Sequence, residues 1–244
     1  MTPIRRYNDD ISRQLVDFDR SQKVVVEAFD ALYQRLVQDD SNQNRLMSSL
    51  KKWVGVNSTK RGIYLWGGVG RGKTYLMDLF YECLPFPDKR RVHFHRFMLS
   101  IHEELECLQG VRNPMNRIAA GIADNTKVLC VDEFFVLDIG DAMLLSGLLE
   151  GLLTKGVVFV ATSNTHPDSL YADGLQRDSF LPAIKIIKKF TDVIELSGAS
   201  DYRLRSLTKA TLYHFPHNED SEQHLYASFV ELAPYSGNIK KNEL

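Results

Sequence analysis

The stretch GGVGRGKT, residues 67–74, decides the fold, because it has the spacing G-x-x-x-x-G-K-[ST] of a phosphate-binding loop. The apolar run GIYLW, residues 62–66, precedes it and is typical of a strand. The segment YLMDLFY, residues 75–81, follows it as an amphipathic helix that Pro85 ends. A strand, a glycine loop and a helix are the context that the motif requires. The alternative, a glycine-rich turn that binds nothing, is disfavoured by both flanking elements.

The residue types in this loop suit a nucleotide. Glycines let successive backbone N–H groups turn toward phosphate oxygens, and the helix N-terminus adds partial positive charge. We expect Lys73 to neutralise the β- and γ-phosphates and the Thr74 hydroxyl to coordinate Mg²⁺. Arg71 could reach phosphate or lie in solvent. The predicted nucleotide-binding residues are Gly67, Gly68, Val69, Gly70, Arg71, Gly72, Lys73 and Thr74.

The second motif is a pair of carboxylates, Asp132 and Glu133. They directly follow the apolar run KVLCV, residues 127–131. Buried parallel strands present functional groups at their carboxyl ends, so both carboxylates should lie beside the loop. Asp132 would then hold Mg²⁺ through water, and Glu133 would polarise the attacking water. A glutamate directly after the magnesium-binding aspartate is typical of the branch of phosphate-loop enzymes that hydrolyse ATP. In that branch another strand lies between the strand that ends in the aspartate and the strand that precedes the loop. The guanine-reading motif N-K-x-D is absent from the sequence, which also favours ATP over GTP.

Two further residues could complete the site. Residues 138–153 are predicted to form a helix and residues 157–161 a buried strand that runs into Asn164. Asn164 is suited to positioning the water or sensing the γ-phosphate, although Asn is also common in turns. Arg177 could reach the nucleotide of a neighbouring subunit or be a surface arginine. Residues 192–196 are predicted to form the fifth strand.

The remaining segments carry weaker signals. Residues 1–18 are expected to form an arm, and residues 22–38 a helix that Asp19 or Ser21 caps. Gln22 could hydrogen-bond an adenine edge or face solvent. Residues 91–97 alternate as a strand does, and residues 98–109 follow as a helix.

Side chains outside the two motifs leave two alternatives open. His93 and His95 would share one strand face and could bind metal, although a structural role is favoured in the absence of a third ligand. Phe97, Met98, Phe134 and Phe135 could grip a polypeptide, although aromatic residues at such spacings are more often core.

Composition limits the protein class. The 244 residues are 44% hydrophobic and 25% charged, which is ordinary for a globular protein. The sequence has 30 Lys and Arg residues and 31 Asp and Glu residues. The resulting net charge of −1 gives no overall positive field that would indicate binding to nucleic acid or to an anionic membrane. Three cysteines without a C-x-x-C pair fit a reducing compartment. Without an apolar signal segment or a long apolar run, we expect a cytoplasmic protein.

The motifs together resemble the ZapE family of AAA+ ATPases, which includes bacterial cell-division proteins and mitochondrial AFG-one-like ATPases. The resemblance rests on GIYLWGGVGRGKTYLMDLFY, HFHRFM, HEEL, VDEFFVLDIGDAM, ATSN, LYADGLQRDSFLPAI and DYRLR, which together span about residues 20–207. It implies that Asp132 and Glu133 are the Walker B pair, Asn164 the first sensor and Arg177 an arginine finger in trans. It also implies a homo-oligomer that acts at the division site, where it associates with the FtsZ ring and lowers FtsZ polymer stability with ATP.

The predicted architecture is an α/β AAA+ P-loop core with a parallel five-stranded sheet. We expect an N-terminal arm with helices over residues 1–56, the ATPase core over 57–200 and a partial C-terminal region over 201–244. Since the family continues beyond this point, Arg203 or Arg205 would substitute for a second-sensor arginine.

Three alternatives to a division ATPase remain open. The chain could be a nucleotide-gated adaptor, a quality-control factor associated peripherally with the inner membrane, or a nucleic-acid-linked AAA+ loader. The near-zero net charge counts against the loader.

Overall fold

Five parallel strands form one sheet in the order β2-β3-β4-β1-β5. The computed structural model describes residues 1–43 and 62–197, which lie within the first of two compact units, Met1–Gly198. The strands are β1 (Gly62–Trp66), β2 (Lys89–His93), β3 (Val128–Asp132), β4 (Val158–Ser163) and β5 (Thr191–Glu195). The predicted parallel five-stranded sheet is confirmed, and β4 separates β3 from the loop strand β1, as expected for an ATP-hydrolysing branch.

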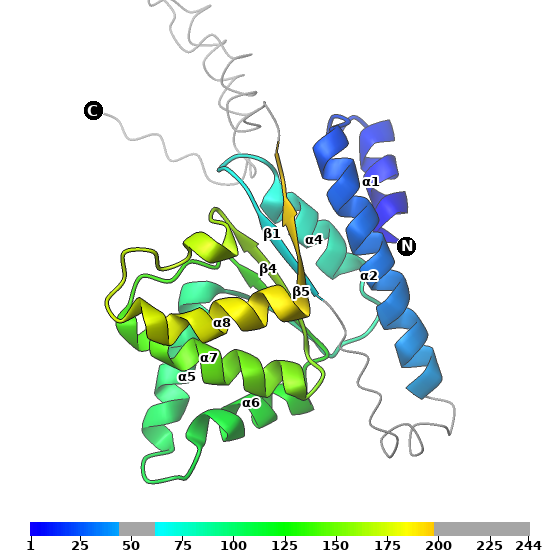
Figure 1. Ribbon diagram of the computed structural model, residues 1–244. Coiled ribbons are helices and arrows are strands. Elements are labelled where there is room, and N and C mark those ends of the chain that lie inside the picture. Colours follow the sequence, from blue (N-terminus) through cyan, green and yellow to red (C-terminus); the bar gives the residue numbers. More distant parts are fainter. Residues whose placement is uncertain (44–61, 198–244) are drawn as a thin grey trace, which may run out of the picture. The chain divides into compact units, whose positions relative to one another are not determined.

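Helices cover both faces of the sheet (Figure 1). The three helices of one face pack with alternate strand residues such as Ile63, Leu65 and Cys130, and the four helices of the other face pack with Tyr64, Leu129 and their neighbours. The first set is α1 (Pro3–Ser12), α2 (Arg20–Gln43) and α4 (Lys73–Cys83). The second set is α5 (Phe94–Cys107), α6 (Pro114–Asp124), α7 (Ile139–Thr154) and α8 (Arg177–Phe190). Because successive side chains of a strand point to opposite faces of the sheet, each strand contributes to two hydrophobic cores, one on each face.

The N-terminal segment, expected as an arm over residues 1–18, contains the helix α1, which the sequence did not predict. Pro3 begins α1 at a position that tolerates proline, and Ile4, Tyr7 and Ile11 recur at helical spacing toward the core. The next helix begins as predicted, since an Asp19 carboxylate oxygen accepts from the backbone N–H of Ser21. A ring stack at 4.7 Å between Phe29 and Phe80 packs α2 on α4.

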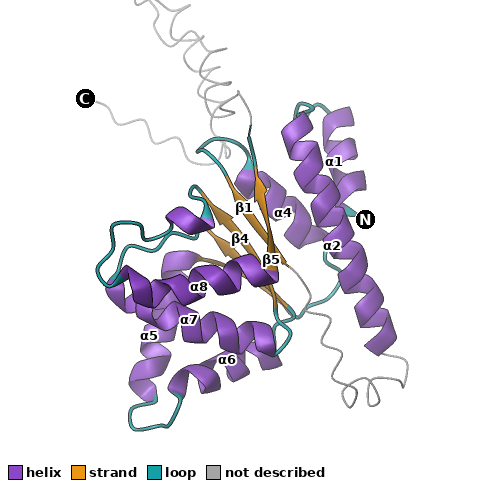
Figure 2. Cartoon of the chain, in the orientation of Figure 1, coloured by secondary structure: helices purple, strands orange, loops and turns teal. Residues whose placement is uncertain are grey.

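The predicted strand over residues 91–97 is also wrong in its bounds. Strand β2 ends at His93, and α5 starts at Phe94. Phe94, Phe97, Met98 and Ile101 are all buried, with the spacing of one helix face, so tertiary packing selected the helix over the apparent alternation. Helices α6 and α8 were not predicted. The secondary structure of the described residues is mapped in Figure 2.

Candidate active site

The glycine loop connects β1 to α4 at the carboxyl end of the sheet (Figure 1). Gly72 lies in the left-handed region at φ 89°, which favours glycine, and a Cβ there would come within 2.8 Å of Gln22 Nε2, so the Gln22 side chain would have to move. Lys73 Nζ donates to the carbonyls of Gly67 and Gly68, each at 2.7 Å. The loop thus carries its ammonium group at the start of a helix that has no side-chain cap, a combination suited to anions.

The side chains of the loop are largely accessible. Thr74 and Val69 are exposed, and Arg71 is partly exposed. An exposed Thr74 hydroxyl at the first turn of α4 leaves an oxygen available to a cation. The side chain of Arg71 lies near Gly68, because its Nε would be 3.5 Å from a Cβ placed on that glycine.

Gln22 joins α2 to the loop. Its Nε2 donates to the carbonyl of Arg71 at 3.2 Å, and the residue is only 4% exposed, so a solvent-facing role is wrong. Its Oε1 is buried and has no hydrogen-bond partner within the described residues. A buried acceptor without a partner is costly, which makes this oxygen a candidate contact for a ligand N–H group.

Asp132 ends β3 and is 3% exposed. Its Oδ2 accepts from Arg91 Nε at 2.6 Å, and its Oδ1 accepts from Thr162 Oγ1 at 3.3 Å. Each carboxylate oxygen has about two lone pairs, so both retain capacity for a further donor. The carboxylate is therefore oriented from two neighbouring strands, β2 and β4.

Glu133 follows in the left-handed region at φ 54°, while its side chain is exposed. This conformation costs a non-glycine residue about 1–2 kcal/mol and has to be held by its surroundings. Thr162 supplies the contacts: its Oγ1 accepts from the Glu133 N–H at 3.2 Å, and its carbonyl accepts from the Phe134 N–H at 2.7 Å. The turn presents the Glu133 carboxylate to solvent directly beside the buried Asp132.

Asn164 and Arg177 lie on different elements. Asn164 is exposed and directly follows β4, at the same end of the sheet as Asp132. Arg177 begins α8, and its Nη2 donates to the carbonyl of Asp168 at 2.7 Å. Its guanidinium group therefore contacts its own chain, and its Nε is buried without a hydrogen-bond partner among the described residues. Arg203 and Arg205 lie outside the described residues.

Two alternatives from the sequence are corrected by burial and secondary structure. Phe97, Met98 and Phe134 are core residues, at most 2% exposed, and only Phe135 of the four aromatic and methionine candidates is exposed. His93 ends β2 whereas His95 lies in α5, so they share no strand face. No group of three His, Cys, Asp or Glu side chains that could hold a metal occurs within residues 1–43 and 62–197.

The donor set at the loop fits a hydrated Mg²⁺. Such an ion takes one or two carboxylates together with substrate phosphates rather than a cage of protein ligands. A buried, oriented Asp132 with free lone pairs and an exposed Thr74 hydroxyl meet that requirement.

Sequence reasoning missed Arg91 and the bridging role of Thr162. Arg91 Nε reaches Asp132, and its Nη1 also donates to Asp78 of α4. Burial by itself lowers the pKa of Arg91, but the hydrogen bonds to Asp132 and Asp78 outweigh it and raise the pKa above its ordinary value. The only sign of this role in the sequence was that Arg91 is a basic residue at the start of a segment with the alternating pattern of a strand.

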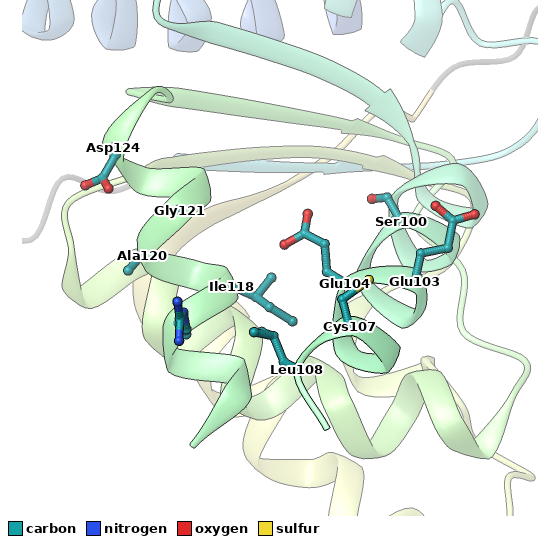
Figure 3. Close-up of a pocket in the computed structure, with 10 residues that line it drawn as sticks. Ser100, Glu103, Glu104, Cys107, Leu108, Ile118, Ala120, Gly121 and Asp124 are labelled. Atoms are coloured by element: carbon teal, nitrogen blue, oxygen red, sulfur yellow. The ribbon is translucent and has the colours of Figure 1, made fainter. Parts of the chain in front are cut away.

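A separate pocket of about 640 Å³ lies between α5 and α6 (Figure 3). Its lining includes apolar side chains such as Leu108 and Ile118 and the acidic side chains of Glu103, Glu104 and Asp124. None of its lining residues belongs to the loop or to the carboxylate pair, so it is distinct from the candidate active site.

None of the described helices is both long and apolar enough to cross a lipid bilayer.

Comparison with known proteins places these features in context. The family model of the AFG1-like ATPases matches residues 1–244. The Cell division protein ZapE of Escherichia coli K12 is 46% identical over 241 residues, which cover 96% of this chain and 64% of that protein. Lactation elevated protein 1 homolog B of Danio rerio is 42% identical over 185 residues, which cover 71% of this chain and 37% of that protein. The chain therefore spans less than two thirds of the length of these curated relatives.

A likeness to a solved structure concerns the fold alone. The crystal structure of DnaI matches with a TM-score of 0.51 at 16% identity, over 75% of this chain and 88% of that one. At such low identity the match supports the shared arrangement of strands and helices and says nothing of ligands or partners.

Proposed function

This chain belongs to the AFG1-like ATPase family, and from that premise we propose that it binds ATP with Mg²⁺ at residues 67–74 and hydrolyses it by attack of water. The observation that carries the proposal is the juxtaposition of two carboxylates of different exposure. Asp132 is buried and hydrogen-bonded, whereas Glu133 is held in a left-handed turn with its carboxylate exposed. One environment suits a fixed metal contact, and the other suits a base that accepts a proton.

The residues of the loop and of the strand ends divide the work. Backbone N–H groups at the start of α4 and the ammonium group of Lys73 bind phosphate oxygens. Hydrogen bonds to the carbonyls of Gly67 and Gly68 place that ammonium group within the loop. Glu133 accepts a proton from the attacking water, and Asn164 orients that water. Thr74 and Asp132 hold Mg²⁺, which supplies charge neutralisation on the phosphoryl oxygens when bound.

We assign ATP rather than GTP to the site on the basis of Gln22 as well as the missing guanine motif. The Oε1 of Gln22 is a buried acceptor beside the loop, and the 6-amino group of adenine is a donor where guanine carries an oxygen. The test is a competition titration of fluorescent ATP with ATP and with GTP. Equal competition would contradict this assignment.

The proposal for hydrolysis is tested by phosphate release with ATP and Mg²⁺ across protein concentrations. Lys73→Ala is expected to abolish binding or turnover, and Glu133→Gln to keep binding while slowing hydrolysis. Lys155→Ala and Glu150→Gln are matched controls, because both side chains are exposed on or just after α7, away from the loop. Normal turnover by Glu133→Gln would remove Glu133 from the role of base.

We propose a homo-oligomer in which Arg177 enters the nucleotide site of a neighbouring subunit. An arginine in trans offsets charge on the phosphoryl group in the transition state. The rate per molecule should then rise with protein concentration. A rate that is independent of concentration would contradict a shared site.

The cellular role that we propose is in bacterial cell division at the division site, with FtsZ as partner. The support is the 46% identity to a protein named for cell division, together with the resemblance carried by the long motifs. FtsZ polymers sedimented with this chain should become less abundant with ATP and unchanged with Glu133→Gln. An effect that persists with a non-hydrolysable analogue would favour the nucleotide-gated adaptor, and a salt-dependent mobility shift with DNA would favour the loader.

A quality-control role at the inner membrane is the remaining candidate. Its support is the resemblance of the long motifs to the mitochondrial AFG-one-like ATPases. Peripheral association is tested by flotation with anionic vesicles, and binding there without any effect on FtsZ would favour this candidate over the division role.

A further inference from the structure

Arg91 occupies the middle of β2, a strand at the edge of the sheet, and pairs in register with Cys130 of β3. Its side chain reaches two carboxylates from different elements: Nε donates to Asp132 Oδ2 at 2.6 Å, and Nη1 donates to Asp78 of α4. The Arg91 side chain is 20% exposed, that of Asp132 5% and that of Asp78 47%. The guanidinium group therefore bridges the loop helix and the carboxylate that is expected to meet Mg²⁺.

The charges of this cluster do not balance. Two carboxylates carry −2 and one guanidinium carries +1, because arginine stays protonated at every working pH. The cluster of Asp78, Arg91 and Asp132 thus has a net charge of −1 with its cation already in place. Without Arg91, two carboxylates would face the same position with a charge of −2, which is an arrangement that attracts a divalent cation.

We infer that Arg91 is a positioning residue of the active site, a resident cation that holds and neutralises Asp132 so that a divalent metal enters only together with the nucleotide phosphates. The inference rests on the proposed function, since it concerns the metal that accompanies ATP. The phosphates supply the extra negative charge and the extra oxygen ligands that overcome repulsion between Arg91 and the metal. Asp78 keeps the guanidinium group oriented from the side of α4.

The fork shape of the guanidinium group is essential to this role. Nε and Nη1 donate in fixed directions to two acceptors at once, which a lysine ammonium on a flexible stem does not reproduce. Arg91→Lys therefore keeps the charge and loses the geometry, whereas Arg91→Gln loses both. The two variants separate exclusion of the metal from orientation of Asp132.

The experiment is a titration of the nucleotide-free protein with Mn²⁺, followed by the electron paramagnetic resonance of the free ion. We expect Arg91→Gln to bind Mn²⁺ at least ten-fold more tightly than the unmodified protein, and Arg91→Lys to stay within three-fold of it. The double variant Asp78→Asn, Arg91→Gln should lose the gain, because one of the two carboxylates is gone. Arg90→Gln is the matched control, a neighbouring strand arginine that lies 5.7 Å from the ring of Phe97 and away from the carboxylates.

Cooperative urea unfolding serves as the check of folding for all variants, and binding of fluorescent ATP to the unmodified protein tests the proposed function separately. Equal Mn²⁺ affinity of Arg91→Gln and the unmodified protein would overturn the inference, as would a gain of the same size in Arg91→Lys. Should Arg91→Gln fail to fold, Arg91→Lys decides by kinetics. Its kcat is expected to fall several-fold with KM for ATP unchanged, and an unchanged kcat would overturn the role in orientation. Failure of the unmodified protein to bind ATP would sink the proposed function instead.

Discussion

Thr162→Val is the substitution that tests most directly how the active-site turn is held. Thr162 is 3% exposed, and its hydroxyl both donates to Asp132 Oδ1 and accepts from the Glu133 N–H. Valine has the same shape but neither donates nor accepts. The substitution therefore removes the two contacts that join the carboxylate pair to β4 and leaves the packing of the sheet in place.

The magnitude follows from these two hydrogen bonds. A neutral hydrogen bond contributes about 1 kcal/mol and one to a charged group about 1.5–3 kcal/mol, with the lower values fitting bonds as long as these. The added methyl group returns about 0.8 kcal/mol. We expect a net loss of about 2 kcal/mol in the free energy of unfolding, which lowers Tm by about 4–8 °C in a chain of this size. Catalysis should fall further than stability suggests, because the left-handed conformation of Glu133 loses its side-chain anchor.

The assay compares Thr162→Val with Thr162→Ser, which keeps the hydroxyl and loses only the methyl group. Serine should cost about 1 kcal/mol of stability and leave kcat unchanged. Valine should lower kcat about ten-fold, corresponding to about 1.4 kcal/mol of lost transition-state stabilisation. Urea unfolding gives the first quantity and phosphate release the second. A valine variant whose kcat stays within two-fold of the serine variant would refute the reasoning.

Three further results are expected. Gly72→Ala should weaken binding of fluorescent ATP by about ten-fold, since a Cβ would sit 2.8 Å from Gln22 Nε2 in a left-handed conformation that costs about 1–2 kcal/mol; unchanged affinity would speak against the loop geometry. Phe29→Ala should lower the free energy of unfolding by about 3–5 kcal/mol in urea, because it empties the ring stack between α2 and α4; a small loss would mean that α2 contributes little to stability. Iodoacetamide at pH 8 should label the exposed Cys107 first and Cys130 only in urea, because burial raises the pKa of the Cys130 thiol and shields it; rapid native labelling of Cys130 would place β3 outside the core.

The elements around the nucleotide loop could be predicted from the sequence because their signals are local. β1, β3 and β4 are short apolar runs that end in functional residues, and the structure has them within two residues of the predicted bounds. The relation between the two motifs also followed, since parallel strands bring their carboxyl ends to one edge. The order β3-β4-β1 agrees with the expected separation of the strands.

The parts that failed depend on contacts between distant segments. The apparent alternation over residues 91–97 concealed a helix face, and α1 gains its stability from packing on α2 and α4 rather than from its own polar sequence. Arg91 is 41 residues from Asp132 and 13 from Asp78, so no spacing rule connects them. The roles of individual site residues stay predictions until they are measured.

The contacts of Arg177 bear on whether it can serve a neighbouring subunit. Its guanidinium group donates to the Asp168 carbonyl at 2.7 Å, and Asp168 is itself held by Lys188 at 2.8 Å. Leaving that carbonyl costs one hydrogen bond from a charged group, about 1.5–3 kcal/mol, whereas an arginine finger accelerates hydrolysis by about 10³–10⁵, or about 4–7 kcal/mol. The internal contact is therefore too weak to oppose docking at a neighbouring nucleotide. In the proposed homo-oligomer the encounter between subunits would then limit the action of Arg177, so we expect the concentration at which turnover rises to report the affinity of the subunit interface.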